Sequence, residues 1–528
     1  MGGDRARMLR WAPVAAVLVL FLLAGYVALR LTNPAPSVPA GGGAIEACDP
    51  ALSPPLPLDS HGDSLYPNLG NAGYDVQHYT LDLAADPDAY TLSGTAAIRA
   101  LAVQDLSTCS LDFHGFDIHS LTVDGRPADY QRDGNKLKID LGSVGRGQVF
   151  TITVAYSGTP DPSTASAYGA DLGWLRGATG TYVSSEPAGA ENWFPVNDHP
   201  CDKATYTFRI TVPKPYVVAA NGQLAGTYDH GDTTTYLWEA REPLASYLAS
   251  VNVGDFVLHS EEGPAGLPIR SYYLRAIAPQ ATAAFAQTAE QIAFFNSIFG
   301  PYPFEAYGVV VVDGGADTWA MENQTLSLFG RNVATDGSAA TVAPHELAHQ
   351  WFGDSVSLKS WRDIWLNEGF ATYAEALWYE HLHGPAALEE RMRAIYPGTG
   401  SRALFPPGNP PADDLFDTAV YDRGALTLHA LRRQVGDAAF FAILRTYADR
   451  YRYGNASTDD LIAVANEVSG QDLQSLFQAW LYDEAIPAYP QPAPDSSLES
   501  WPLPQRLRWP TLPTGALPRQ PRIPRQPS

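Results

Sequence analysis

Two histidines and a glutamate near the middle of the chain have the spacing of a helical metal site. His345, Glu346 and His349 form the pattern His-Glu-x-x-His. Because positions i and i+4 of a helix lie one turn apart on the same face, both imidazoles can bind one metal ion with Glu346 beside it. Zinc lowers the pKa of bound water to about 7, and a nearby carboxylate can then accept the proton. The pattern predicts a zinc hydrolase in which Glu346 is the general base.

A second acidic residue completes the predicted ligand set. Glu368 follows His349 by 19 residues and lies in an apolar, aromatic stretch that is typical of a helix. Two histidines and one carboxylate form an established zinc set that leaves the fourth position to water. A third histidine ligand is excluded, because Phe352 and Ser355 stand where the glycine and histidine of that alternative motif would be. We therefore expect one zinc ion held by His345, His349 and Glu368.

Four short blocks of sequence form a set. Residues 345–353 read HELAHQWFG and residues 361–375 read WRDIWLNEGFATYAE; residues 320–323 read AMEN and residues 421–425 read YDRGA. Together they resemble the zinc, exopeptidase and Y-x-K-G motifs of the M1 family of zinc aminopeptidases, which are gluzincins. The resemblance implies that Glu322 binds the free α-amino group of the substrate. It also implies that the Tyr421 hydroxyl hydrogen-bonds the tetrahedral oxyanion.

The resemblance extends upstream and covers the chain from about Tyr74 to about Pro490. Residues 184–187 read SSEP, and residues 194–205 are similar to a degraded form of a further family run. By that match, Glu186 is a second carboxylate that faces the substrate amine. Buried carboxylates recognise an ammonium through charge-assisted hydrogen bonds, and a blocked N-terminus would leave them unpaired. The resemblance thus implies an aminopeptidase that removes the N-terminal residue from peptides.

Two positions near the site depart from the family pattern. Trp319 stands where the exopeptidase motif has its first glycine, so a bulky ring replaces a residue that lets substrate backbone approach closely. Arg423 replaces the usual lysine after Tyr421, which keeps the charge but changes the donor geometry. Neither change affects the metal ligands. The effect of Trp319 on the first specificity pocket and the preferred N-terminal residue stay open.

Two other functions compete with the aminopeptidase. A thermolysin-like zinc endopeptidase would share the metal site but would not need Glu322 or Glu186, and it would cleave N-acetylated peptides. A non-enzymatic surface protein would keep the fold for binding alone. The complete set of ligands, base and tyrosine argues against the second alternative.

The N-terminus predicts a membrane anchor. Three arginines precede a strongly apolar run, residues 11–29, that has about the length needed to cross a bilayer. No Lys or Arg occurs between Arg30 and Arg99, so the positive-inside rule places the N-terminus in the cytoplasm and the rest outside. We expect a single-pass protein of the cell membrane with an extracytoplasmic catalytic domain. Cleavage of the apolar run as a signal peptide, after the small residues at 38–40, would make it secreted instead.

Composition narrows the partners. The chain has 528 residues and a formal net charge of -23, which argues against nucleic acid as a partner because phosphate binding needs clustered Lys and Arg. Peptides with a free N-terminus are the expected substrates. The cysteines Cys48, Cys109 and Cys201 permit one disulfide, but the sequence does not fix the pairing, and the oligomeric state also stays open.

The chain pattern is typical of an α+β multidomain protein. Period-two alternation indicates strands from Tyr74 onward, helical spacing begins near Ala281, and residues 309–312 form the one strand expected before the zinc helix. The resemblance implies a saddle-like all-β domain followed by a mainly α, thermolysin-like zinc peptidase domain, without the family's large helical C-terminal domain. The expected segments are a cytoplasmic basic stub and transmembrane helix at 1–32, a Pro/Gly-rich linker at 33–70, the β domain at 71–262, the catalytic domain at 263–488 and a disordered Pro/Arg-rich tail at 489–528.

The start of the zinc helix has two alternatives. Pro344 immediately precedes His345 and is tolerated in a first helical turn but not in a helix interior. Either Thr341 caps a helix that starts there, or a longer helix from about Ser338 is kinked at the proline.

Overall fold

The computed structural model describes residues 58–165, 170–314 and 319–491 of the chain. The apolar run at residues 11–29 and most of the predicted tail lie outside these ranges. Within them, no helix combines the length and the apolar character that crossing a membrane requires.

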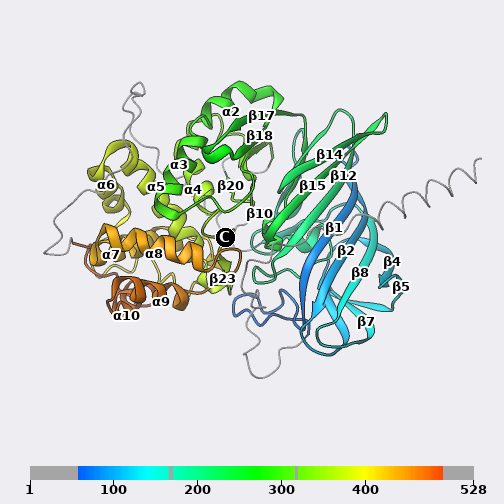
Figure 1. The fold of residues 1–528 in the computed structure, drawn as a ribbon, viewed down its shortest axis with the longest axis horizontal. Helices are drawn as coiled ribbons and strands as arrows, with labels where there is room; N and C mark the ends of the chain where they lie inside the picture. The colour runs from blue at the N-terminus through cyan, green and yellow to red at the C-terminus, as the bar shows by residue number, and fades with distance from the viewer. Residues whose placement is uncertain (1–57, 166–169, 315–318, 492–528) are drawn as a thin grey trace, which may run out of the picture. The chain divides into compact units, whose positions relative to one another are not determined.

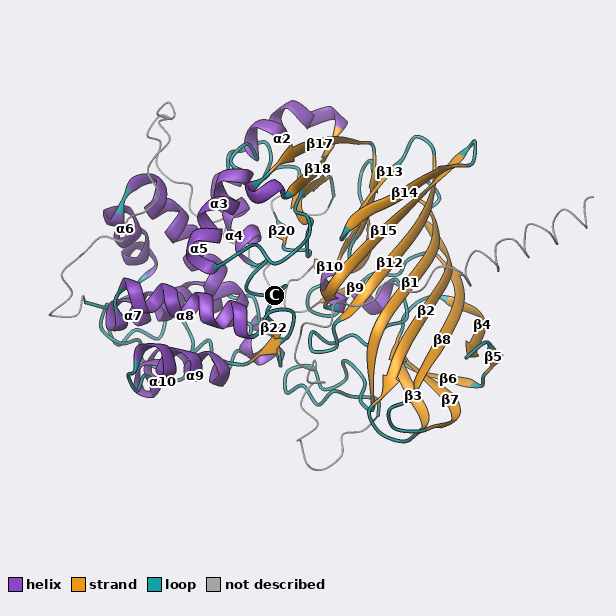
Figure 2. Cartoon of the chain, in the orientation of Figure 1, coloured by secondary structure: helices purple, strands orange, loops and turns teal. Residues whose placement is uncertain are grey.

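A large twisted sheet dominates the first domain, as the orange arrows of Figure 2 show. Buried and exposed side chains alternate along its strands, which is the pattern that the sequence predicted for this region. The first strand pairs in parallel with β12 and antiparallel with β2, so it is central rather than at an edge. The eight strands of this sheet are, in spatial order, β14 (Gln223–Asp229), β15 (Thr233–Leu244), β12 (Ala204–Pro213), β1 (Tyr74–Asp86), β2 (Thr91–Ala102), β8 (Val149–Gly158), β4 (Asp117–Val123) and β5 (Arg126–Pro127).

Two smaller sheets complete the first domain. The five-stranded sheet contains β11, the strand that ends two residues before Glu186. Its order is β13 (Val217–Ala220), β16 (Val251–Gly254), β11 (Gly180–Ser184), β10 (Ala170–Arg176) and β9 (Ser163–Ala165). The three-stranded one has the order β3 (Leu106–Asp112), β7 (Lys136–Val144) and β6 (Tyr130–Asp133).

The catalytic domain contains more β-structure than the sequence predicted. The expected strand at residues 309–312 is present, but it is one of five strands in a sheet. The first of these strands ends at Glu262 and pairs with the next, so this sheet begins before residue 263, where we expected the domain to start. The sheet order is β17 (Phe256–Glu262), β18 (Pro268–Leu274), β19 (Val309–Val312), β21 (Ser327–Gly330) and β20 (Ala320–Met321). Of the strands that the sequence did not place in this domain, β18 and β21 are buried along almost their whole length and show no alternation, whereas β17 does alternate and falls within the residues assigned to the first domain.

Helices form most of the rest of the catalytic domain (Figure 1). They are α2 (Ala278–Ala284), α3 (Thr288–Phe299), α4 (Ala339–Ala348), α5 (Trp365–His383), α6 (Pro385–Ile395), α7 (Gly424–Val435), α8 (Asp437–Arg450), α9 (Thr458–Ser469) and α10 (Gln474–Leu481). A two-stranded ladder joins β22 (Ser357–Leu358) to β23 (Asn455–Ala456). The longest of these helices, α5, is buried over most of its length and packs against α4, α6 and α7.

The zinc helix follows the longer of the two alternatives. Helix α4 begins at Ala339, with Ser338 at its N-terminal boundary, so Pro344 lies inside it and Thr341 is not its cap. The helix ends at Ala348, and His349 keeps helical torsion angles just beyond that end.

Residues 58–70 are not the free tether that the predicted linker implied. Asp63 is buried, and its Oδ2 accepts hydrogen bonds from the backbone N–H of Trp361 and the hydroxyl of Ser360, both at 2.9 Å. The ring of Tyr66 packs edge-on against Trp361. The proline and glycine content of the segment suggested flexibility, but composition does not reveal such specific contacts with distant residues.

Candidate active site

The three predicted zinc ligands converge in the structure. His345 lies in α4, His349 follows the last residue of that helix, and Glu368 lies in the first turn of α5. Oε2 of Glu368 is 3.3 Å from Nε2 of His345 and 3.6 Å from Nε2 of His349. In a tetrahedral zinc site with bonds of about 2.1 Å, neighbouring donor atoms are about 3.4 Å apart. The side chains present therefore fit one zinc ion.

Both histidines direct Nε2 to this point because their other ring nitrogen is engaged. Nδ1 of His345 is 2.8 Å from Oε1 of Glu375, and Nδ1 of His349 is 3.1 Å from the carbonyl oxygen of Phe352. Donation from each Nδ1–H leaves Nε2 unprotonated for a metal. Glu375 is itself paired with Arg391 of α6. A chain of charge-assisted contacts thus runs from the partly buried Arg391 of α6 through the buried Glu375 to the first histidine.

A pair of glycines lets α5 and α7 approach closely. A Cβ added to Gly369 would lie 2.8 Å from the Cα of Gly424. A Cβ added to Gly424 would likewise lie 2.8 Å from the Cα of Gly369. Gly369 follows the ligand Glu368, and Gly424 follows the π-helical turn Ala419–Arg423. The missing side chains therefore bring that turn next to the ligand helix.

Tyr421 lies in this turn and covers the first ligand. Its ring is stacked on the imidazole of His345, with ring centroids 6.0 Å apart and an interplanar angle of 18°. Burial, together with the negative charges of Glu368 and Glu186, raises the pKa of Tyr421 well above its usual value. The hydroxyl therefore keeps its proton and can donate a hydrogen bond.

The arginine that replaces the family's lysine has a different environment. The Arg423 guanidinium donates hydrogen bonds to the carbonyl oxygens of Trp480 at 2.7 Å and Leu404 at 3.1 Å. These contacts hold the turn of Tyr421 against the end of α10. Arg423 thus helps to hold the turn that contains Tyr421. An arginine suits this role because its guanidinium has five N–H donors and can bond several carbonyl oxygens at once.

Glu346 is buried beside the second ligand. One of its carboxylate oxygens, one oxygen of Glu322 and a ring nitrogen of His349 lie within 4.8 Å of one another. Burial raises the pKa of Glu346 to about 8, and the positive charges of the two histidines oppose this rise. A zinc cation would act in the same direction as those charges and favour the carboxylate form that a general base requires.

The two carboxylates expected to bind an amine also reach the ligand cluster. Oxygens of Glu186, Glu322 and Glu368 lie within 4.8 Å of one another, and all three residues are buried. Glu186 comes from the first domain, two residues after β11, whereas Glu322 follows β20 of the catalytic domain. Burial raises the pKa of Glu322, although the positive charge of His349 opposes it. Three carboxylates this close require cations to compensate them.

Trp319 packs against the first domain. Its ring centroid is 5.6 Å from that of Tyr182, a buried residue of β11, and the two rings are tilted by 35°. Two residues later, the sulfur of Met321 accepts a hydrogen bond from the hydroxyl of Ser184 at 3.5 Å. The segment just before Glu322 therefore contacts β11, the strand just before Glu186.

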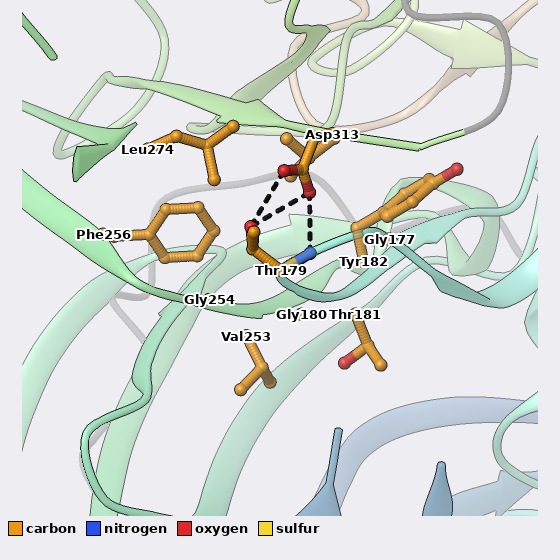
Figure 3. Close-up of a pocket in the computed structure, with 11 residues that line it drawn as sticks. Gly177, Thr179, Gly180, Thr181, Tyr182, Val253, Gly254, Phe256, Leu274 and Asp313 are labelled. Atoms are coloured by element: carbon orange, nitrogen blue, oxygen red, sulfur yellow. Dashed lines mark hydrogen bonds between the residues drawn. The ribbon is translucent and has the colours of Figure 1, made fainter. Parts of the chain in front are cut away.

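A small pocket near this junction is distinct from the ligand cluster. Figure 3 shows Thr179 bonded to the carboxylate of Asp313 through its backbone N–H and its hydroxyl, at 3.1 and 3.0 Å. The lining residues are mainly apolar or glycine and include Phe256 and Leu274. None of the predicted site residues lines it. These bonds anchor the turn between β10 and β11 to the end of β19.

Three residues near the site were not among those predicted from the sequence. Glu375 follows Glu368 by seven residues, which is two helical turns, so this spacing could have identified it. Arg391 lies on the next helix and pairs with Glu375. Gln350 donates a hydrogen bond to the carbonyl oxygen of Glu322, which lies 28 residues earlier in the chain. No sequence pattern marks these last two contacts, because both depend on how separate elements pack.

The geometry is that of a zinc metallopeptidase, and comparison with known proteins identifies the family. Residues 75–248 match the Peptidase M1 N-terminal domain, and residues 283–480 match the Peptidase family M1 domain. An M1 zinc metallopeptidase from Deinococcus radiodurans has 32% sequence identity and a TM-score of 0.76, over 82% of this chain and 99% of that one. The chain belongs to the M1 family.

Curated relatives include longer proteins. Aminopeptidase M1-B of Oryza sativa is 28% identical over 78% of this chain, and aminopeptidase N of Streptomyces lividans is 27% identical over 78%. In each case the match covers 50% of the relative. The chain therefore spans about half the length of these curated relatives, whereas it covers 100% of a solved two-domain M1 zinc metallopeptidase at a TM-score of 0.75.

The chain of contacts from Arg391 to His345 gives a test of metal binding. Replacement of a carboxylate that orients a zinc-bound histidine weakens metal affinity by about 10- to 100-fold. We expect Glu375→Gln to raise the zinc dissociation constant by that factor, measured by competition with a chromogenic chelator. Glu390→Gln, which removes an exposed carboxylate from α6, is the matched control. Equal zinc affinity of the Glu375→Gln variant and the wild-type protein would show that this chain does not support the ligand.

Proposed function

We propose that this protein is a zinc aminopeptidase that hydrolyses the N-terminal residue from peptides. The observation that carries the proposal is the position of Glu186 and Glu322, whose carboxylate oxygens lie within 4.8 Å of an oxygen of Glu368. One extended residue spans about 3.5 Å. An ammonium held by these carboxylates therefore leaves room for a single residue before the scissile carbonyl reaches the metal site.

Each residue of the cluster has one chemical role in this proposal. His345, His349 and Glu368 would hold a zinc ion, which would supply the Lewis acidity that polarises a carbonyl and lowers the pKa of water. Glu346 accepts the proton of the attacking water and passes it to the leaving amine. The Tyr421 hydroxyl donates a hydrogen bond to the carbonyl oxygen as negative charge develops there. The catalytic groups thus need no proton carrier other than Glu346.

Substrate recognition is assigned to the two remaining carboxylates. Glu186 and Glu322 bind the α-ammonium through charge-assisted hydrogen bonds, which are stronger in a buried site than in water. An acetylated N-terminus cannot form them and leaves two buried carboxylates unpaired, so it is rejected. A point mutant of the Deinococcus radiodurans M1 zinc metallopeptidase was crystallised with a Tyr-Ser-Ala substrate. A mutant two-domain M1 zinc metallopeptidase was crystallised with L-arginine. Both ligands offer the free α-amine that we expect this protein to bind.

We further propose that the catalytic domain is extracytoplasmic and that residues 11–29 anchor it to the cell membrane as a single-pass helix. The support is the apolar run behind Arg5, Arg7 and Arg10, together with a disulfide at Cys201, since disulfides persist in oxidising compartments. Cys109 is a buried free thiol. Cys48, the third cysteine of the chain, lies outside the described residues.

Membrane fractionation tests this location. The full-length protein is expected to stay with the membrane pellet after extraction with alkaline carbonate, because a spanning helix is not released by such treatment. External protease should digest the catalytic domain in intact cells. Recovery of the protein in the culture medium, shortened near residue 40, would instead indicate a cleaved signal peptide.

Replacement of the general base tests the activity itself. General-base catalysis contributes about 10²- to 10⁴-fold, so Glu346→Gln should lower kcat for a fluorogenic aminoacyl substrate by at least that factor. The variant should still bind one zinc ion per chain, because the ligands are unchanged. The wild-type protein should lose activity with a chelator and should not cleave the N-acetylated form of the substrate. Substantial turnover by the variant would refute the general-base role, and cleavage of the acetylated substrate would favour the endopeptidase alternative.

A further inference from the structure

Gln350, the residue after the second zinc ligand, connects the zinc helix to the segment that contains Glu322. The Nε2 of its side chain donates a hydrogen bond to the carbonyl oxygen of Glu322 at 2.8 Å. Its Oε1 accepts a hydrogen bond from the backbone N–H of Thr325, also at 2.8 Å. A third contact comes from the hydroxyl of Tyr302, at 3.1 Å from the same oxygen. Gln350 has no exposed surface, so these bonds do not compete with water.

The segment that Gln350 holds contains a strained residue. Thr325 has a φ of +67°, a left-handed conformation that is rare and unfavourable for a β-branched side chain. Thr325 is fully buried, and its Oγ1 accepts a hydrogen bond from the backbone N–H of Gly222 at 2.8 Å. Such conformations persist only where several contacts enforce them. Here the contacts come from Gln350 on one side and from the first domain on the other.

The first domain reinforces the same turn at a second point. The Nδ2 of Asn221 donates a hydrogen bond to the carbonyl oxygen of Gln324 at 2.8 Å. The buried guanidinium of Arg270, in β18 of the catalytic domain, donates a hydrogen bond to the carbonyl oxygen of Gly222 of the first domain and also lies next to Thr325. The backbone on the C-terminal side of Glu322 is therefore fixed from two directions. On the metal side, the only side chain among the described residues that bonds the carbonyl oxygen of Glu322 is that of Gln350.

The contacts of Gln350 bear on the distance between a bound substrate amine and the metal. The carboxylate of Glu322 lies within 4.8 Å of a ring nitrogen of His349, the neighbour of Gln350 in the chain. His349 is thus a proposed zinc ligand, and the next residue, Gln350, holds the backbone of Glu322, the proposed amine-binding residue. A shift of about 1 Å in such a constellation is enough to cost roughly 10²-fold in rate.

We propose that Gln350 is a positioning residue that sets the separation between the amine-binding Glu322 and the zinc site, and thereby restricts the enzyme to substrates with a free N-terminus. The inference rests on the proposed aminopeptidase function and names the residue that enforces its exopeptidase character. Gln350 touches neither substrate nor metal in this account. It acts through the backbone of Glu322 and through the strained turn at Thr325.

A pair of hydroxamate inhibitors separates this role from general support of the fold. Leucine hydroxamate binds zinc and offers an α-amine, whereas 4-methylpentanohydroxamic acid binds zinc without one. The ratio of their inhibition constants measures how much the amine contributes to binding. We expect the wild-type zinc enzyme to prefer the amine-bearing compound, and Gln350→Met to reduce that preference by about tenfold or more, because hydrogen bonds to a charged partner are sensitive to position.

Two further readouts and two comparison variants separate a specific effect from a general one. The inhibition constant of the compound without an amine should change by less than about threefold in Gln350→Met, and zinc content should stay at one ion per chain. Glu322→Gln is the reference variant, because it weakens the amine contact directly. Gln291→Met, which alters another buried glutamine on α3, is the matched control and should leave the preference unchanged.

The possible outcomes are distinct. An unchanged preference in Gln350→Met, or equal weakening of both inhibitors, would overturn the positioning role while leaving the aminopeptidase function intact. If the wild-type enzyme shows no preference for the amine, the proposed function fails, and this inference fails with it. If Gln350→Met does not fold, Gln350→Asn retains the amide but is one methylene too short to reach both partners. That variant should lose part of the preference, and full retention would contradict the proposal.

Discussion

The burial of several carboxylates around two histidines is the constraint on which the rest of this structure depends. Glu186, Glu322, Glu346, Glu368 and Glu375 are each less than 10% exposed. Like charges at this proximity in a poorly hydrated site are costly unless cations offset them. Arg391 offsets Glu375. A zinc ion would compensate the ligand group, and in the proposed function the ammonium of a substrate would compensate Glu186 and Glu322. If this proposal holds, the charges of the site are balanced only when both metal and amine are bound, and its chemistry depends on the same charges as its specificity.

Both domains are needed to hold these charges in place. Lys203 of the first domain is buried and donates hydrogen bonds to the carbonyl oxygens of Asp354 and Ser355, just after the zinc helix, at 2.7 and 3.1 Å. Burial lowers the pKa of Lys203 to about 7. Asp63 contributes a comparable link from the segment before β1 to Trp361, ahead of α5. The two carboxylates proposed to bind the amine come one from each domain, Glu186 from the first and Glu322 from the catalytic domain. In the proposed function, the contacts between the two domains therefore set the relative positions of Glu186 and Glu322.

Much of the site could be predicted from the sequence, because its residues lie in short, dense patterns. The spacing of His345 and His349 on one helix, and the carboxylate of Glu368 on the next, are local signals with a direct geometric meaning. The family resemblance added Glu322, Glu186 and Tyr421, which the structure brings to the same cluster. The small sheet of the catalytic domain, the ordered contacts of residues 58–70 and the bridge made by Gln350 were not predicted. These features arise from packing between segments far apart in the chain, and no local periodicity encodes them.

The contacts of Trp319 also could not be predicted from the sequence. Sequence alone identified it as a departure from the family motif and suggested a change in the pocket. In the structure its ring packs on Tyr182, so the substitution also strengthens contact between the strand of Glu322 and the first domain. A bulky residue can therefore serve as an anchor where the sequence pattern suggested only an obstruction.

The central claim is that the buried carboxylates admit one residue between a free amine and the metal. Mass spectrometry of an unblocked synthetic peptide incubated with the zinc-loaded protein tests this claim most directly. The account predicts a ladder of products, each shorter by one residue from the N-terminus, and no cleavage of the same peptide after N-acetylation. Internal fragments, release of dipeptides, or cleavage of the acetylated peptide would contradict it.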